Sequence, residues 1–255
     1  MATVWIPTFV AALVFACGVG GLYMQRLHPE PQSEIAREMI TAILGLITLL
    51  LALVLGVTVG SAYGRFTTQN TEMENLSARA LQLDLAFEEY GPETKPFRAK
   101  LKEDMSRAYQ LFWGSGNDAS SDSTALSVSA ALPSLQAADE FLASLDPQTP
   151  AQRRAAAAAA TEVDSIQSVR IAMSLQLASS APWPLLVVVV SWSLLLFFGF
   201  GLRSQFSATT VAALGFGAFA VASAIFLILD LNEPYRGLFR VPPAALLQTI
   251  DALNR

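Results

Sequence analysis

The sequence has very few of the residues on which catalytic and metal sites are usually built. Its 255 residues include one cysteine, Cys17, and one histidine, His28. A disulfide framework or a zinc site of cysteine and histidine ligands therefore does not fit within one chain. We also find no glycine-rich phosphate loop and no HExxH pattern, so we expect no enzymatic activity, no cofactor and no bound metal.

Charged residues are scarce as well, at 15% of the chain, where about 25% is usual for a soluble domain. Four windows have no charged residue at all, namely 2–25, 39–64, 171–202 and 204–229. Each is long enough to supply the roughly 20 apolar residues that cross a bilayer. No Lys or Arg precedes Arg26, so we interpret the first window as a retained span rather than a cleaved signal. The sequence thus predicts four membrane spans.

The remaining charge is concentrated in an insert between the second and third spans. Residues 65–180 include 15 acidic and 10 basic residues, and the whole chain has a net charge of −5. An acidic insert without a basic stripe argues against nucleic acid as a partner. Near the membrane, five arginines lie on the insert side and three on the other, which favours a cytoplasmic insert and cytoplasmic termini. The five are Arg65, Arg79, Arg170, Arg236 and Arg240, and the three are Arg26, Arg37 and Arg203.

The second span has no residue that would end its helix at the membrane surface. No proline occurs between residues 42 and 91, and apolar residues keep a spacing of three and four as far as Phe87. We therefore predict one helix of about 55 residues that leaves the membrane unbroken and stops near Tyr90. Further helices are expected over 96–113, 133–145 and 150–179, and a short amphipathic helix is expected near the C-terminus. The composition of 114–124 is typical of a mobile loop.

The predicted fold is an all-α membrane protein with an all-helical cytoplasmic insert. Its domains are the spans of 1–64, the helical domain of 65–181, the spans of 182–230 and a C-terminal segment of 231–255. Because only the residues 203–207 connect the third and fourth spans, we expect these two helices to lie side by side and antiparallel.

One face of the second span has unusually small or hydroxylated side chains. Successive positions on this face, which becomes aromatic at its end, are Thr41, Gly45, Thr48, Ala52, Gly56, Val59, Tyr63, Phe66 and Asn70. The opposite side has large aliphatic residues such as Leu46 and Leu53. Such a face is typical of close helix packing, and it is also suited to lining a pore; both readings stay open. Gly56 lies at the edge of this face. We assign Gly56, Gly60 and Gly64 to helix packing, and we expect Gly60 and Gly64 to seat a neighbouring helix.

Two short stretches make the chain recognisable. Ser61-Ala62-Tyr63-Gly64-Arg65-Phe66 marks the exit of the second span, and Asn232 to Arg240 follows the fourth span. Together with the long second helix, they resemble the bacterial bestrophin-like domain family over essentially the whole chain. More distantly, Tyr63-Gly64-Arg65-Phe66 and Glu233-Pro234-Tyr235-Arg236-Gly237 are similar to the membrane-exit segments of bestrophin ion channels.

That resemblance implies a homopentamer in the lipid bilayer whose second helices surround a pathway for inorganic ions. It places the neck of this pathway among Thr48, Ala52, Leu55 and Val59. The sequence contains no acidic cluster similar to the calcium clasp of animal bestrophins. No charged residue occurs within the charge-free windows of the spans, which disfavours a pump and leaves a passive channel possible. The alternative function is a non-conducting scaffold or sensor whose helical domain binds a protein.

Overall fold

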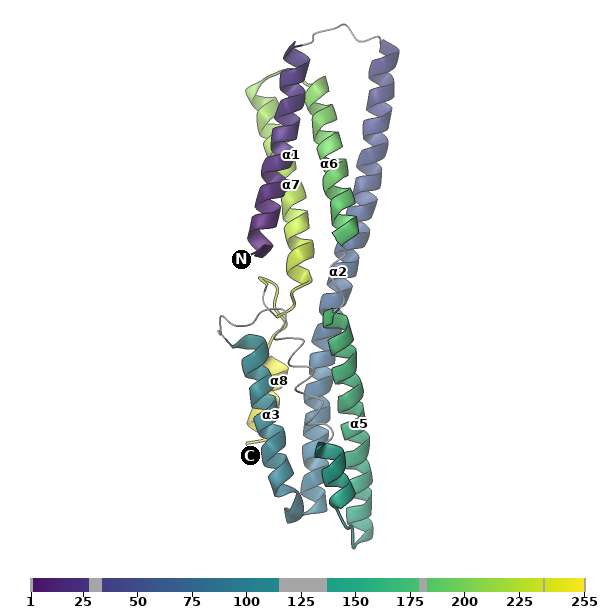
Figure 1. Ribbon diagram of the computed structural model, residues 1–255, viewed down its shortest axis with the longest axis vertical. Helices are drawn as coiled ribbons and strands as arrows, with labels where there is room; N and C mark the ends of the chain where they lie inside the picture. The colour runs from purple at the N-terminus through teal and green to yellow at the C-terminus, as the bar shows by residue number, and fades with distance from the viewer. Residues whose placement is uncertain (1, 28–33, 115–136, 179–182, 236, 255) are drawn as a thin grey trace. The chain divides into compact units, whose positions relative to one another are not determined.

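The computed structural model describes residues 2–27, 34–114, 137–178, 183–235 and 237–254 (Figure 1). Its helices are α1 (Ala2–Leu27), α2 (Glu34–Tyr90), α3 (Lys95–Trp113), α5 (Pro150–Ala178), α6 (Trp183–Arg203), α7 (Ala208–Leu231) and α8 (Ala244–Ala252). A 3-10 turn, η1 (Pro92–Thr94), connects α2 to α3, and residues 137–144 are also helical. Within these ranges there is no strand, so the all-α prediction is confirmed. Of the predicted mobile loop, all but Gly114 lies outside the described residues.

Four helices, α1, α2, α6 and α7, are long and apolar enough to cross a membrane. The chain is therefore a multi-pass membrane protein. It forms two compact units. The membrane unit contains Met1–Arg65, Ala181–Glu233 and Gly237–Phe239, and the helical unit contains Phe66–Ser180, Pro234–Arg236 and Arg240–Arg255. The single helix α2, of 57 residues, contributes its first part to one unit and its second part to the other.

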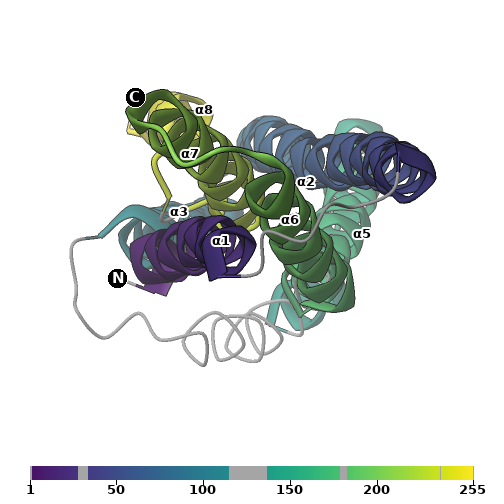
Figure 2. The same ribbon diagram turned by 90° about the horizontal axis from the view of Figure 1, so that it is seen from above.

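In the membrane unit, α1 packs along both α6 and α7 (Figure 2). Glycines make the contact between α1 and α6 close. A Cβ on Gly201 would lie 2.9 Å from the Leu22 amide nitrogen, and one on Gly21 would lie 3.0 Å from the Leu202 amide nitrogen. Without side chains at these positions the two backbones meet directly, which is a common way of packing helices in lipid.

The third and fourth spans do run antiparallel, but they are not each other's main neighbour. The aromatic ring of Phe197 in α6 fits against Gly217 in α7. Elsewhere the contact between α6 and α7 is much smaller than the contact that each makes with α1. The short turn at 203–207 keeps their ends together, and the first span packs on both of them.

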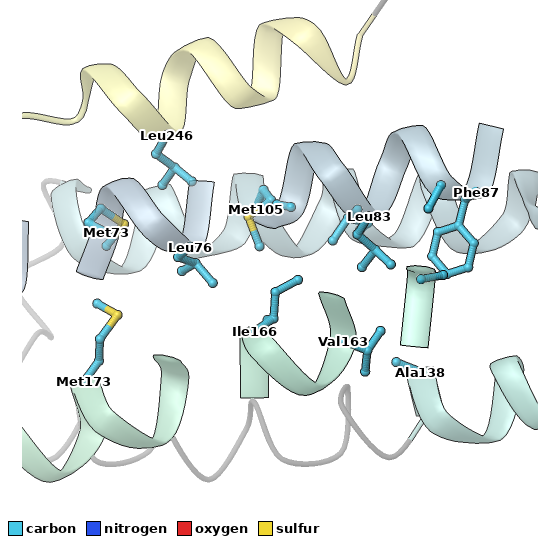
Figure 3. Close-up of a cluster of buried hydrophobic side chains, with 14 of the residues drawn as sticks. Met73, Leu76, Leu83, Phe87, Met105, Ala138, Val163, Ile166, Met173 and Leu246 are labelled. Atoms are coloured by element: carbon cyan, nitrogen blue, oxygen red, sulfur yellow. The ribbon is translucent and has the colours of Figure 1, made fainter. Parts of the chain in front are cut away.

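The helical unit is built around a continuous apolar core (Figure 3). Every third or fourth residue of α2 beyond the membrane faces this core, from Met73 to Phe87. Leu101 and Met105 of α3, Val163 and Ile166 of α5, and Leu246 of α8 face the same core. The aromatic rings of Phe87, Phe97 and Phe141 pack at one end of it, with centroids 5.0–6.0 Å apart. The 3.6-residue period of the sequence therefore becomes the inner face of a helix bundle.

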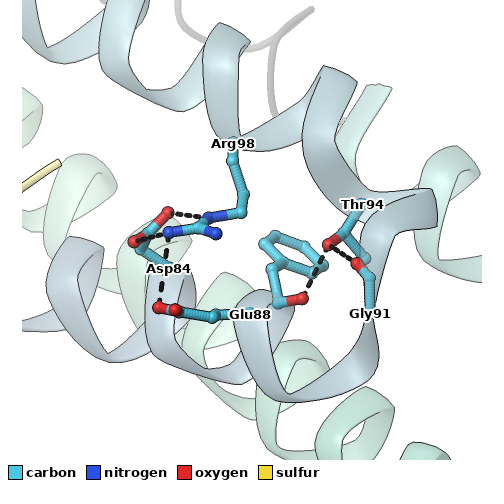
Figure 4. Close-up of polar contacts among 6 residues, drawn as sticks. Asp84, Glu88, Gly91, Thr94 and Arg98 are labelled. Carbon is cyan, nitrogen blue, oxygen red and sulfur yellow. Dashed lines mark hydrogen bonds and ion pairs between the residues drawn. The ribbon is translucent and has the colours of Figure 1, made fainter. Parts of the chain in front are cut away.

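The turn from α2 to α3 is fixed by polar contacts (Figure 4). Gly91 has a φ of 133°, which other residues rarely adopt, and Pro92 follows it. The fully buried Thr94 hydroxyl lies 2.6 Å from the Phe87 carbonyl oxygen and 2.8 Å from that of Gly91. Arg98 donates from Nε and Nη2 to the two carboxylate oxygens of Asp84, at 2.6 and 2.7 Å. These contacts end the long helix at Tyr90 and direct α3 back along it.

Candidate functional site

Within the membrane unit, α2 presents three faces of different chemistry. Leu44, Leu51, Thr58 and Ala62 form the buried face, and Leu44 packs against Gly199 of α6. Large aliphatic side chains, including Leu46, Leu53 and Val57, form an exposed face. The third face is the one singled out from the sequence, and it is exposed too. Only 11% of the most apolar window of α2 is buried within the chain, against 28–33% for the other spans.

The predicted pathway residues are distributed as follows. Thr41, Thr48 and Ala52 are exposed, and Tyr63 is 57% exposed. Leu55 and Val59 are half-buried. Phe66 belongs to the helical unit, where it packs against the apolar core. The structure thus leaves the residues from Thr41 to Ala52 uncovered on one helix face, while Phe66 at the far end contributes to a folded core.

The glycines of α2 have open space where a side chain would lie. A Cβ built on Gly45, Gly56, Gly60 or Gly64 would meet no atom within 4 Å. A packing role for Gly56, Gly60 and Gly64 therefore stays a prediction about contacts with another chain. Glycines that do seat a neighbouring helix include Gly217 in α7 and, two in each span, Gly18 and Gly21 of α1 and Gly199 and Gly201 of α6. Their close spacing within two spans was a sequence signal that we did not use.

The hydroxyl of Thr48 is a polar group on the exposed small-residue face. Its Oγ1 donates to the carbonyl oxygen of Leu44 at 2.8 Å, one turn earlier in the same helix. The proton is therefore committed to the backbone, and the oxygen remains able to accept. This face offers small side chains and acceptor oxygens where a lipid-facing helix has large aliphatic groups.

The segment after α7 is held by a buried carboxylate. Asp230 is 2% exposed, and its Oδ1 and Oδ2 accept from the backbone N–H groups of Leu238 and Phe239, each at 2.8 Å. Gly237 allows this closure, because a Cβ there would lie 2.5–2.7 Å from the carboxylate atoms. In the sequence, Asp230 is only the last residue of the predicted spans of 182–230. The signal that we missed is an aspartate in the last turn of an apolar helix, followed seven residues later by glycine.

The other predicted exit residues fall into both units. In the membrane unit, Arg65 Nη1 donates to Asn232 Oδ1 at 3.2 Å, and Glu233 is exposed. In the helical unit, Pro234 and Tyr235 are buried. Arg236 lies outside the described residues.

Tyr235 is a buried polar residue of the exit segment. Its hydroxyl donates to Oε1 of Gln69 at 3.2 Å, and its ring packs against Phe112 and Trp113 with centroids 4.6 and 5.5 Å away. Burial raises the pKa of the Tyr235 hydroxyl above its ordinary value of 10.0, so the group stays neutral. Trp113 Nε1 in turn donates to the Val241 carbonyl oxygen at 3.0 Å. These contacts fix the exit segment to α2 and α3 within the helical unit.

Among the described residues, no three His, Cys, Asp or Glu side chains lie close enough to hold a metal ion. His28 lies outside the described residues.

Comparison with known proteins identifies the chain through its family. A protein-family model described as Bestrophin-like domain matches residues 10–246, which is nearly the whole chain. Neither the curated proteins nor the solved structures give a match. The matched range includes most of the first span, the other three spans, the exit segment and most of the helical unit. The chain therefore belongs to the bestrophin-like family.

Proposed function

We propose that this protein is a homo-oligomeric, passive ion channel in which copies of α2 surround a central pathway for inorganic ions. The number of copies, five, comes from the resemblance to bestrophins. In this arrangement the membrane is the bacterial inner membrane, and the insert and both termini are cytoplasmic. Thr41, Thr48, Ala52 and Val59 border the pathway.

The observation that supports this proposal is the exposed small and hydroxylated face of α2. Large aliphatic side chains suit contact with lipid, and α2 already has such a face on its other side. A second exposed face of threonine, alanine and glycine has no such use in lipid, because small residues gain their packing energy only against another helix. Symmetric copies around an axis give this face both a neighbouring helix and a shared central path.

The ionisable residues are consistent with a passive pathway. Among the described residues of the membrane unit, Asp230 is the buried charged side chain, and both of its oxygens accept backbone N–H groups. Asp230 follows the charge-free window of 204–229, so no charged residue of this span lies at membrane depth, where a pump would need one.

Cysteine accessibility during current recording tests the proposal. In a Cys17→Ser background, Thr48→Cys and Ala52→Cys would be reconstituted in planar bilayers and exposed to a charged methanethiosulfonate reagent. We expect single-channel currents that change on modification, because a charge would enter the pathway. Leu53→Cys is the matched control: residue 53 is exposed on the aliphatic face, so its modification should leave the current unchanged.

Two results would contradict the proposal. One is an absence of current from purified protein in any salt. The other is an equal response at positions 48, 52 and 53. A dry, sealed α2 face without current would instead support a scaffold or sensor that acts through the helical unit.

A further inference from the structure

The turn Gly237–Phe239, which we call the exit turn, presents large apolar side chains on a fixed backbone. Leu238 is 77% exposed and Phe239 is 46% exposed. Their amide groups are nevertheless bound to the two oxygens of the buried Asp230. The Gly237 amide also donates to the Glu233 carbonyl oxygen at 3.1 Å.

Such an arrangement needs an explanation. Removing a carboxylate from water is costly, and here two charge-assisted hydrogen bonds to backbone N–H groups offset that cost. These hydrogen bonds fix the backbone of the exit turn, although its side chains Leu238 and Phe239 do not pack in a core of the chain. Exposed apolar groups on a rigid support are typical of a surface that contacts something else.

The depth of the exit turn follows from its neighbours in the membrane unit. Arg65 is the first charged residue after the charge-free window of 39–64, so it marks the level at which α2 leaves the hydrocarbon. Its guanidinium donates to Asn232, the first residue after α7. The ends of both spans therefore lie at one level, and the exit turn, closed on Asp230, lies next to it.

Aromatic side chains occur at the same end of the membrane unit. α1 and α6 run opposite to α2 and α7, so their first residues lie at this end (Figure 1). Trp5 is 73% exposed and Trp183 is 49% exposed. Tryptophan at the end of a span is typical of the boundary between lipid headgroups and acyl chains. The exit turn thus lies at the same end of the membrane unit as these tryptophans, at the level of the lipid interface.

We propose that the exit turn is a lipid anchor: Leu238 and Phe239 insert at the boundary between headgroups and acyl chains, in the leaflet where α7 ends. Asp230 is the positioning residue, because its carboxylate fixes the backbone that presents them. The occupant of this surface is the bilayer itself. A second copy of the chain over the turn is the competing occupant.

The depth of a spin label tests this proposal without reference to ion conduction. In the full chain, Cys17→Ser removes the one cysteine, and Leu238→Cys then carries a nitroxide in liposomes of phosphatidylethanolamine and phosphatidylglycerol. Collision with oxygen reports lipid, and collision with a water-soluble nickel chelate reports water. Phe216→Cys, exposed on α7, is the control for lipid, and Asp251→Cys, exposed on α8, is the control for water.

We expect the ratio of oxygen to nickel collisions at position 238 to be several-fold higher than at 251 and lower than at 216. A ratio equal to that at 251 would overturn the anchor, because the turn would then face water. Low collision rates with both reagents, with spectral broadening that disappears on dilution with unlabelled protein, would also overturn it in favour of a second copy.

Asp230→Asn tests the positioning role in the same chain. In asparagine an NH2 donor replaces one of the two accepting oxygens and faces a backbone N–H, so the label at 238 should become more mobile and its collision ratio should fall towards that at 251. The label at 216 should keep its ratio, which would show that the spans still fold. An unchanged label at 238 would refute the role of Asp230.

Discussion

Gly20 and Gly21 in α1 are neighbours in sequence, but their surroundings differ completely. A Cβ on Gly21 would lie 3.0 Å from the amide nitrogen of Leu202 and even closer to the carbonyl oxygen of Phe198, both in the backbone of α6. A Cβ on Gly20 would meet no atom within 4 Å. The same substitution, glycine to alanine, therefore tests the contact between α1 and α6 at one position and leaves it intact at the other.

The expected free energies follow from these contacts. In either place alanine favours the helix by about 0.5–1 kcal/mol over glycine. At position 21 this gain is opposed by overpacking, which typically costs about 1–3 kcal/mol. Backbone atoms cannot swing aside as side-chain ends do, so we expect the upper part of that range. Since the helix term is common to both variants, Gly21→Ala should be less stable than Gly20→Ala by about 2–3 kcal/mol.

The native cysteine provides the assay. The thiol of Cys17 lies in α1 and donates to the Leu194 carbonyl oxygen of α6 at 3.4 Å, so its reactivity reports separation of these helices. Purified variants in dodecyl maltoside would be titrated with sodium dodecyl sulfate and pulsed with a maleimide. Gly21→Ala should label at a clearly lower fraction of the denaturing detergent than the wild type. Gly20→Ala should label at the wild-type fraction or above it. Equal midpoints for the two variants would refute the close backbone contact between α1 and α6.

Two further predictions concern the helical unit. Tyr235→Phe removes the hydrogen bond to Gln69 and should lower the free energy of unfolding by about 1 kcal/mol at neutral pH. Burial raises the pKa of Tyr235, so above the unfolded pKa of 10.0 the free energy of unfolding of the wild type should fall by up to about 1.4 kcal/mol per pH unit. The phenylalanine variant lacks the ionising hydroxyl and should lose less stability in alkaline thermal melts. Parallel declines in the two proteins would contradict this. Arg98→Lys breaks the two-bond pairing with Asp84 and should cost about 1 kcal/mol, whereas Arg107→Lys, in an exposed pair with Glu103, should cost about 0.3 kcal/mol or less. The hydrogen bond to Asp84 raises the pKa of Arg98, so the stability lost in Arg98→Lys should be constant from about pH 6 to 9. Equal losses of stability in Arg98→Lys and Arg107→Lys, measured by thermal melts, would refute the difference between the two ion pairs.

The sequence alone determined the spans and the course of the long helix. Whether a segment can cross a membrane depends on the length of its charge-free run, which is a local property. The same holds for the continuation of α2 to Tyr90, because no proline interrupts it and Gly91-Pro92 stops it. The inner face of the helical unit followed from residue spacing, as Met73 and Phe87 show.

Only the tertiary structure decided which face of each span meets another helix. Gly60 of α2 and Gly201 of α6 are equivalent in sequence terms, since both lie in charge-free runs among other glycines. A Cβ on Gly60 would meet no atom within 4 Å, whereas a Cβ on Gly201 would meet the backbone of α1. The sequence also did not show that Asp230 is buried, because its burial depends on a turn at Gly237 that brings the N–H groups of Leu238 and Phe239 to its carboxylate. Contacts of this kind join residues from different segments, so no local pattern records them, and the three-dimensional path of the chain creates them.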